Sequence, residues 1–356
     1  MIAEDSMINI QPTNQSRLEQ TDFNNLAFGR EFSDHMFIMD YQDGKWQSQR
    51  IVPYQTLSMS PAVSVMHYGQ AIFEGMKAFR TDDGKVNMFR PFENIKRFNL
   101  SAERMCMPTI PQEMFIEALE QLLNQDKDWI PKQSDASLYI RPFMYASDEY
   151  IGVKPSETYR FVIFTCPVSK YYKGAVKVKI ETHYSRSVKG GTGFAKAAGN
   201  YAAALYPAKK AQLEGFDQLI WTDAQTHEFI EESGTMNIVF RTGNKIISPA
   251  VSETILRGIT RDSVLQLAVD WGYEVEERPI RVSEIIDLLK AGKLDEAFGA
   301  GTAATIAPIG AISFKDVLYE LPDHKTWEFA NKAAGEMDKI KREKSPDTHQ
   351  WNHFVM

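Results

Sequence analysis

The sequence predicts a mixed α/β protein with two domains, and three observations support this prediction. The chain has 356 residues, whereas a single hydrophobic core stops growing at roughly 250–300 residues. Strand-like and helix-like segments alternate irregularly, with several hairpins, which does not match a regular βαβ winding. The pattern also breaks near residues 167–174. We therefore expect a smaller N-terminal domain over 1–170, an interdomain loop near 167–174, and a larger C-terminal domain over 175–356.

The first half of the chain predicts hairpins and two helices. Residues 1–27 show little pattern and are expected to form a loose arm. The segments HMFIMDY and KWQSQRIVPY flank a turn at Asp43-Gly44 and predict a hairpin. Helices are expected to begin near Pro91 and Pro111, since proline suits the first helical position. Further strands are expected at KVNMF, ASLYIRPFMYA and TYRFVIFTCPV.

The second half predicts shorter strands that alternate with helices. Val176, Val178 and Ile180 alternate with charged residues, which is typical of a half-buried strand. The glycine-rich KGGTG leads into an alanine-rich helix. Two more helices are expected, from about Thr260 to Trp271 and near Ser283–Leu289, together with strands at QLIWT and NIVF and a hairpin at RTGNKIIS.

Composition and charge exclude several classes of protein. The net charge of −7 gives no electrostatic footprint for nucleic acid or an anionic membrane. The polar start does not match a signal peptide, and no run approaches the roughly 20 apolar residues of a membrane span. Both cysteines, Cys106 and Cys166, lie in apolar surroundings and are expected in the core. With two cysteines, no signal peptide and no membrane span, we expect a cytoplasmic protein. No metal, redox or nucleotide motif is present, so no metal is expected.

Two charged residues could take part in chemistry. Lys196 is flanked by Ala195, Ala197, Ala198 and Gly199, and small neighbours leave room for a bulky ring beside a reactive amine. Glu232 precedes a Ser-Gly-Thr turn, where a carboxylate could face a protonated pyridine nitrogen. Taken alone, each residue is more simply explained as a solvent-exposed charge.

Two further segments could bind an anion. Gly258, Ile259 and Thr260 precede a predicted helix, and free N–H groups at a helix start attract phosphate. The alternative is an ordinary helix start with Thr260 as its cap. The glycine-rich residues 299–308 could also approach a small anion, although most such loops are simply turns.

Together these segments form a specific pattern. HYGQAIFEGMKAF, FRPFENIKRF, LYIRP, AKAAGNY, EESGTMN, ILRGITR and FGAGTA follow in this order. From about Phe28 to the C-terminal WNHFV, the chain resembles branched-chain amino acid aminotransferases of fold type IV. This resemblance implies a two-domain fold, with pyridoxal phosphate (PLP) bound at the domain interface.

The resemblance also implies roles for individual residues. Lys196 matches the lysine that attaches to PLP and moves the substrate proton. Further cofactor contacts are implied for Arg97, Tyr201, Glu232, Thr235, Ile259, Thr260 and Thr302. Substrate contacts are implied for Phe28, Tyr68, Phe73, Tyr139, Arg141, Tyr171, Thr235, Thr302 and Ala303, and, from the other subunit of a homodimer, for Ile151 and Val153. Neighbouring Glu231 is expected to face solvent.

The implied reaction is transamination of leucine, isoleucine or valine with 2-oxoglutarate, in ping-pong order. The nearest alternatives are a D-amino acid aminotransferase and an aminodeoxychorismate lyase, which FEGMKAF, LYIRP and ESGTMN disfavour. A dinucleotide-dependent oxidoreductase lacks its strand–GxGxxG–helix fingerprint here. A non-catalytic binding protein would not explain why Lys196 and Glu232 occur together.

Overall fold

The computed structural model describes residues 7–169 and 174–356. Its contacts divide the chain into two units. The first unit comprises Met1–Tyr171, Ala195–Gly199 and Lys339–Met356, and the second comprises Tyr172–Phe194 and Asn200–Asp338. The sequence-based division had assigned the segments 195–199 and 339–356 to the C-terminal domain, whereas their contacts group them with the first unit.

The first unit is built on one large, mainly antiparallel sheet. The hairpin predicted around Asp43-Gly44 is confirmed, with paired strands on either side of this turn. The order across the sheet is β1 (Asn9–Ile10), β3 (Lys45–Pro53), β2 (His35–Gln42), β8 (Tyr159–Val168), β7 (Ser137–Ala146), β5 (Met76–Arg80), β6 (Val86–Phe89) and β19 (Asn352–Phe354), with β4 (Ala71–Phe73) on β7.

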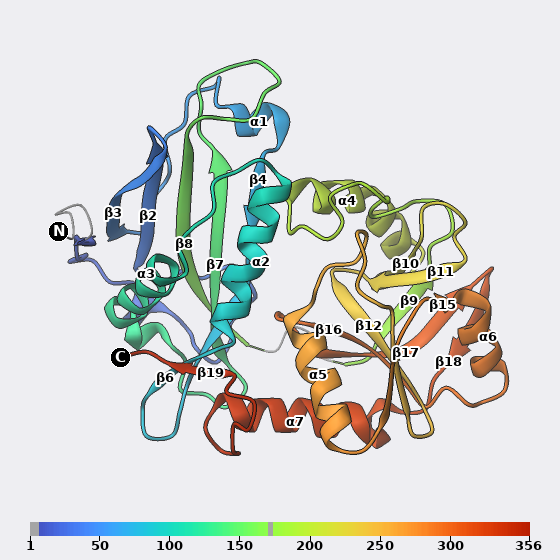
Figure 1. Ribbon diagram of the computed structural model, residues 1–356. Coiled ribbons are helices and arrows are strands. Elements are labelled where there is room, and N and C mark those ends of the chain that lie inside the picture. The colour runs from blue at the N-terminus through green and yellow to red at the C-terminus, as the bar shows by residue number, and fades with distance from the viewer. Residues whose placement is uncertain (1–6, 170–173) are drawn as a thin grey trace. The chain divides into compact units, whose positions relative to one another are not determined.

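Two amphipathic helices cover one face of this sheet (Figure 1). Helix α2 (Pro91–Arg104) begins at the predicted proline, and α3 (Gln112–Gln125) begins just after Pro111. The rings of Phe98 and Phe115 pack on Phe161 of β8, at centroid distances of 5.5 and 5.9 Å. These contacts form the core that fixes α2 in place. The shorter elements are α1 (Ser64–Tyr68), η2 (Leu18–Gln20) and η3 (Lys127–Trp129).

The second unit contains a closed ring of strands. Because β11 pairs with both β10 and β12, the sheet closes on itself. The predicted alternation in β9 is confirmed, since Val176, Val178 and Ile180 are all buried. The ring order is β12 (Met236–Thr242), β16 (Glu296–Gly301), β17 (Thr305–Phe314), β9 (Val176–Ile180), β10 (Gln218–Thr222) and β11 (Phe229–Ser233), extended by β13 (Lys245–Ser248), β14 (Glu274–Glu277), β15 (Ile280–Arg281) and β18 (Val317–Glu320).

Three of the helices in the second half of the chain were predicted from the sequence, and a fourth was not. The predicted helices are α4 (Ala198–Leu213), α5 (Ile259–Asp270) and α6 (Val282–Lys290). Helix α7 (Phe329–Lys341) was not predicted. Its first N–H groups, those of residues 328–330, donate to the buried carboxylate of Glu296 on β16. This helix start therefore depends on a residue distant in sequence, and no local capping signal marks it. The remaining short element is η4 (His324–Thr326).

Two expectations about residue environment have different outcomes. Cys166 is buried as predicted, but Cys106 is exposed, so the prediction that it lies in the core is wrong. Cys106 follows α2 with a φ of 55°, in the turn that leads out of the helix. Among the described residues, no helix is both long and apolar enough to span a membrane, and no cluster of potential metal ligands occurs.

Candidate active site

The main chain of Lys196 is fixed by residues of the first unit. The residue lies two positions before the first residue of α4 rather than within the helix. Its N–H donates to Ser101 Oγ on α2 at 2.9 Å, and its carbonyl accepts from the N–H of Phe73 at 3.1 Å. Its Nζ lies 5.0 Å from the centre of the Phe73 ring. The lysine thus has a rigid backbone and an amine beside an aromatic face.

A buried ion pair lies close to this lysine. Glu74 is completely buried and binds Arg97 through both carboxylate oxygens, with distances of 2.7 Å to Nε and 2.8 Å to a terminal nitrogen. Asn94 donates a third hydrogen bond to the same carboxylate. Burial opposes ionisation of Glu74, but the charge and hydrogen bonds of Arg97, with the charge of Lys196, hold its pKa below the usual value. Glu74 therefore stays ionised near the amine, and Arg97 balances its charge within the pair.

Aromatic residues and one arginine form a second group in the first unit. Tyr139 on β7 packs edge-on against Phe28 at 5.0 Å. The guanidinium carbon of Arg141 lies 4.7 Å from the centre of the Phe73 ring and 5.3 Å from that of Tyr139. Its buried Nε has no hydrogen-bond partner among the described residues. This group combines apolar aromatic rings with Arg141, a cation whose Nε–H can still donate a hydrogen bond.

In the second unit, Glu232 is a buried carboxylate with several partners. Its Oε2 lies 3.1 Å from Nε of Arg186, and its Oε1 accepts from the N–H of Leu256 at 2.8 Å and from Asn237 at 3.3 Å. An adjacent arginine favours the charged form of a carboxylate. Glu232 is thus suited to pair with a protonated ring nitrogen.

The start of α5 lies next to this carboxylate. Gly258 is the N-cap residue, and no side chain caps the helix. A Cβ on Gly258 would lie 1.7 Å from Oδ1 of Asn237, so only glycine fits there. Asn237 also donates to the carbonyl of Leu256. Since a helix start offers N–H groups and a positive dipole end, Ile259 and Thr260 fit a phosphate, while Glu232 fits a pyridinium.

Glu231 does not face solvent, and that prediction is wrong. Residues 230–233 of β11 are all buried, because this strand is covered on both faces. One Glu231 oxygen accepts from Thr254 Oγ1, and the other has no partner among the described residues. Burial raises the pKa of Glu231 to about 7, against the lowering effects of the Thr254 hydrogen bond and the Arg186 charge.

This raised pKa predicts a pH-dependent stability. The unfolded chain releases the Glu231 proton near pH 4.5, whereas the folded chain keeps it to about pH 7. The contribution of this group to stability is therefore fully present below pH 4.5 and is lost as the pH rises to about 7. Because glutamine does not titrate, Glu231→Gln should gain stability relative to the wild type between pH 5 and pH 8. Urea unfolding at both pH values measures this difference.

A matched control is Glu320→Gln, which makes the same change at an exposed position of β18. Its stability difference from the wild type should not change with pH. If the Glu231→Gln difference were equally constant, the buried carboxyl would titrate as it does in the unfolded chain.

The other predicted site residues lie in varied environments. Tyr68, Thr235, Ile151 and Val153 are exposed, and Tyr201 lies in the first turn of α4. Thr302 and Ala303 are half-buried between β16 and β17. Tyr171 lies outside the described residues. Sequence analysis missed the partners Glu74, Arg186 and Asn237. Glu74 stands in the FEGMKAF segment already singled out, while nothing local marks Arg186.

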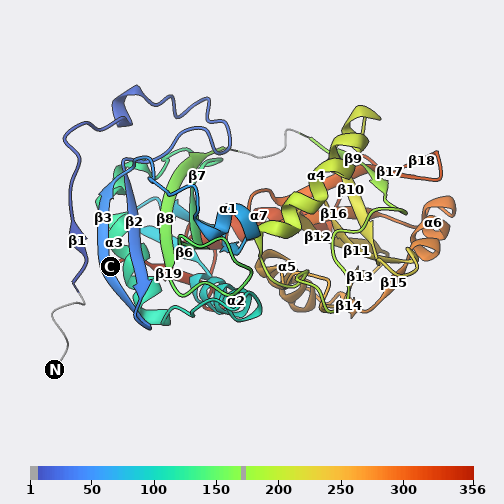
Figure 2. The same cartoon turned by 90° about the horizontal axis from the view of Figure 1, so that it is seen from above.

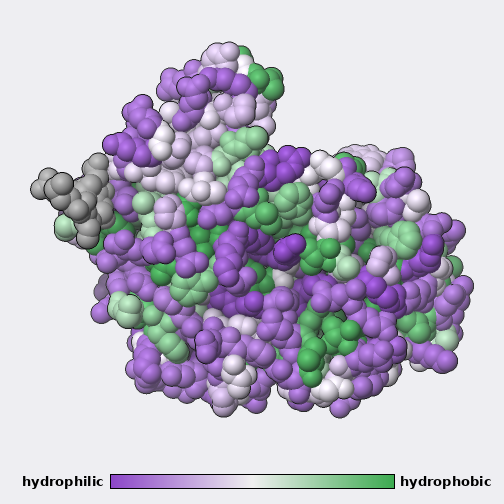
Figure 3. Space-filling view, in the orientation of Figure 1, coloured by the Kyte–Doolittle hydropathy of each residue, from purple (hydrophilic) through white to green (hydrophobic). Residues whose placement is uncertain are grey.

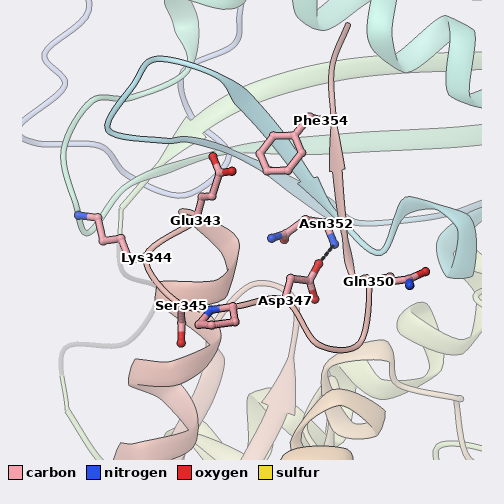
Figure 4. A pocket seen from close by; sticks show the side chains of 8 residues that line it. Glu343, Lys344, Ser345, Asp347, Gln350, Asn352 and Phe354 are labelled. Atoms are coloured by element: carbon pink, nitrogen blue, oxygen red, sulfur yellow. Dashed lines mark hydrogen bonds between the residues drawn. The ribbon is translucent and has the colours of Figure 1, made fainter.

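Two surface cavities of the first unit contain none of these residues. One, of about 560 Å³, lies in the C-terminal segment, where Asp347 accepts the N–H of Asn352 (Figure 4). The other, of about 600 Å³, includes Cys106 and Tyr159. Neither gathers buried charged groups like those around Lys196 and Glu232.

Comparisons with known proteins identify the family of this chain. The family model described as amino-transferase class IV matches residues 71–312. Over 338 residues the chain is 46% identical to branched-chain-amino-acid aminotransferase 2 of Bacillus subtilis (strain 168), covering 94% of this chain and 93% of the relative.

Two solved structures share the fold. The branched-chain aminotransferase of the archaeon Thermoproteus uzoniensis, with norvaline, has a TM-score of 0.75 at 24% identity, covering 90% of this chain and 100% of the other. That of Thermobaculum terrenum, in its PLP form, has a TM-score of 0.73 at 20% identity, covering 92% and 100%. The predicted fold-type IV architecture is therefore confirmed.

The chain belongs to the class IV aminotransferase family. It is accordingly a PLP-dependent transaminase. Its curated relatives place it among the branched-chain amino acid aminotransferases.

Proposed function

We propose that this enzyme transfers the amino group of leucine, isoleucine or valine to 2-oxoglutarate, in ping-pong order. The observation that supports it most strongly is Lys196, whose backbone is fixed on both sides and whose amine lies beside Phe73. The names of the relatives supply the substrate class. The cytoplasm remains the predicted compartment.

The described residues fit PLP. Lys196 would attach to its aldehyde carbon, Arg97 with the N–H groups of Ile259 and Thr260 would bind its phosphate, and Glu232 would hold the proton on its ring nitrogen. Tyr201, Thr235 and Thr302 would add further contacts. When bound, the cofactor supplies an electron sink for the pair of electrons left on the substrate α-carbon.

Lys196 performs the proton transfers. Its Nζ takes the proton from the α-carbon as a general base and returns a proton as a general acid, a role that contributes typically 10²–10⁴-fold in rate. Rigid positioning of this amine reduces the entropy lost on reaching the transition state. The negative charge on Glu74 and the aromatic face of Phe73 keep the amine in place before it acts.

The substrates make different demands on their pocket. A branched aliphatic side chain requires apolar walls, which Phe28, Phe73, Tyr139 and Tyr171 would supply. The carboxylate shared by all substrates would meet Thr235, Thr302 and Ala303, with Tyr68 nearby. 2-Oxoglutarate brings a second carboxylate, which needs a donor among these walls. Arg141 supplies it, because its Nε is buried without a partner among the described residues.

The purified protein's absorption spectrum tests the reaction directly. With PLP bound, the visible absorption band should be lost when leucine is added. After leucine is removed, the band should return when 2-oxoglutarate is added, so the two substrates are never present together. A band that responds to D-alanine but not to L-leucine would overturn the substrate class. A band that returns only when both substrates are present would overturn the ping-pong order.

Arg141→Met should affect the two substrates unequally. Methionine keeps apolar volume between Phe73 and Tyr139 but removes the charge. A charge-assisted hydrogen bond is worth about 1.5–3 kcal/mol, so the KM for 2-oxoglutarate should rise about ten- to a hundredfold. The KM for leucine serves as the internal control and should change only a few-fold. Equal rises for both substrates would show that Arg141 binds the carboxylate that they share.

We further propose that the enzyme is a homodimer in which Ile151 and Val153 contact the partner's substrate. These side chains are 69% and 89% exposed, in a loop beyond β7. Figure 3 shows hydrophobic atoms at the tip of the first unit, where Figure 1 places this loop. Exposed apolar side chains grouped in this way are typical of an interface.

A further inference from the structure

The segment of residues 11–33, called the arm below, is anchored rather than loose. Figure 2 shows it as the blue loop outside the sheet, between β1 and β2. Among the described residues its only regular element is the single turn η2. It is nevertheless attached to the sheet at three places, and each attachment uses buried polar groups.

The first attachment is Asp34, at the entrance to β2. This buried carboxylate accepts hydrogen bonds from Ser16 Oγ, from the N–H of Arg17 and from Trp129 Nε1. Burial of Asp34 opposes its ionisation, but these hydrogen bonds hold its pKa below the usual value. Two of the three donors belong to the arm, so the charge of Asp34 fixes the arm to the end of the sheet.

The second attachment is His35. Its Nε2 accepts the backbone N–H of Thr13 at 2.9 Å, so this nitrogen must carry the lone pair. Its Nδ1 therefore carries the proton and donates to Asp126 at 2.6 Å, while the N–H of His35 donates to the other Asp126 oxygen at 2.9 Å. Asp126 thus fixes both the orientation and the tautomer that binds the arm.

The third attachment lies at the other end of the arm, beside the substrate group. The N–H of Ser33 donates to the carbonyl of Thr165, and the Ser33 hydroxyl accepts from the Thr165 hydroxyl. Ser169 Oγ donates to the carbonyl of Leu26. Between these bonds, Phe28 packs edge-on against Tyr139, whose hydroxyl accepts from Arg141. Asp34 and His35 therefore hold one end of a segment whose other end places Phe28 against Tyr139, two residues predicted to form the pocket wall.

We propose that Asp34 and His35 are positioning residues which, by fastening the arm, hold Phe28 on Tyr139 and so set the preference for large aliphatic side chains. This proposal rests on the proposed function, because it concerns the same pocket. Neither residue touches substrate. Loosening the arm removes one apolar wall while leaving Lys196 and its partners in place, so substrate selection should change and the chemical step should not.

Three variants of the holoenzyme test this proposal. Asp34→Asn removes the charge that holds the arm. Thr13→Pro removes the N–H that His35 accepts, together with a local hydrogen bond from the N–H of Gln15 to the Thr13 hydroxyl. It leaves the buried residues unchanged, in case Asp34→Asn folds poorly. Asp22→Asn is the matched control, since among the described residues this exposed arm carboxylate accepts a hydrogen bond only from the nearby N–H of Asn24. Hydrogen exchange of the arm amides gives a readout that does not depend on activity.

Asp34→Asn and Thr13→Pro should speed exchange across residues 11–33, and Asp22→Asn should not. In Asp34→Asn and Thr13→Pro, the ratio of kcat/KM for leucine to kcat/KM for alanine should fall about two- to tenfold, which is the worth of one aromatic contact. Most of this fall should come from a higher KM for leucine. Phe28→Ala should reproduce this fall. The proposal would be overturned if hydrogen exchange of the arm amides were unchanged in both Asp34→Asn and Thr13→Pro. It would also be overturned if this exchange became faster while the preference for leucine over alanine stayed the same.

Failure of the proposed function would be recognised separately. If the wild type did not use leucine, the preference would be measured between its best amino donor and alanine. The exchange measurement would still decide whether Asp34 and His35 hold the arm.

Discussion

Replacing Lys196 with alanine is expected to abolish transamination while leaving the fold intact. The two hydrogen bonds that fix this residue, to Ser101 Oγ and from the N–H of Phe73, use backbone atoms that alanine retains. In the proposed mechanism this amine performs both proton transfers, so kcat should fall at least about a thousandfold. Steady-state kinetics with leucine and 2-oxoglutarate measure the loss, and a thermal melt verifies the fold.

The control for Lys196→Ala is Lys209→Ala, on the exposed face of α4. It removes an amine from the same part of the chain and should retain nearly full activity. If Lys196→Ala kept more than a tenth of wild-type activity, another amine would have to be the one that moves the proton.

Arg97→Ala is expected to reduce both cofactor affinity and protein stability. Losing the proposed phosphate contact of Arg97 should weaken PLP binding about ten- to a hundredfold, the worth of one charge-assisted hydrogen bond. The structure adds a second effect, because Arg97 neutralises the completely buried Glu74. Removing one partner of a buried ion pair costs about 3–5 kcal/mol. PLP titration of the apoenzyme and chemical unfolding measure the two effects independently.

The double variant Arg97→Ala with Glu74→Gln separates these effects. Without the glutamate charge, no unpaired ion remains in the core, so a large part of the stability should return. PLP affinity should stay low, because the arginine is still absent. A double variant as unstable as Arg97→Ala would show that the loss comes from packing, and recovered affinity would place the phosphate elsewhere.

Much of the fold could be predicted because its signals are local. The hairpin at Asp43-Gly44 and the helices after Pro91 and Pro111 follow from turn chemistry and from apolar spacing along a few residues. Helix α7 escaped prediction because the carboxylate that caps it, Glu296, belongs to a strand more than thirty residues earlier. Residues 1–27 were predicted to be loose for the same reason, since Asp34, His35 and Asp126, the partners of Thr13, Ser16 and Arg17, lie beyond them.

The candidate site shows the same limit. Lys196, Arg97 and Glu232 could be named from motifs, but their partners could not. Which of the two glutamates, Glu231 or Glu232, pairs directly with Arg186 depends on how β11 is placed in the sheet, which the sequence does not state. The wrong assignment of Glu231 to the surface arose because a strand covered on both faces shows no alternation of polar and apolar residues.

The order of strands in the first sheet also bears on aggregation. Its outermost strands are two short terminal pieces, β1 against β3 at one side and β19 against β6 at the other. An uncovered strand presents unpaired N–H and carbonyl groups to other chains. Before β19 pairs with β6, this border of the first sheet is therefore open to strands of other chains. By pairing with residues 87–89, residues 352–354 protect this side of the sheet from association with a second chain.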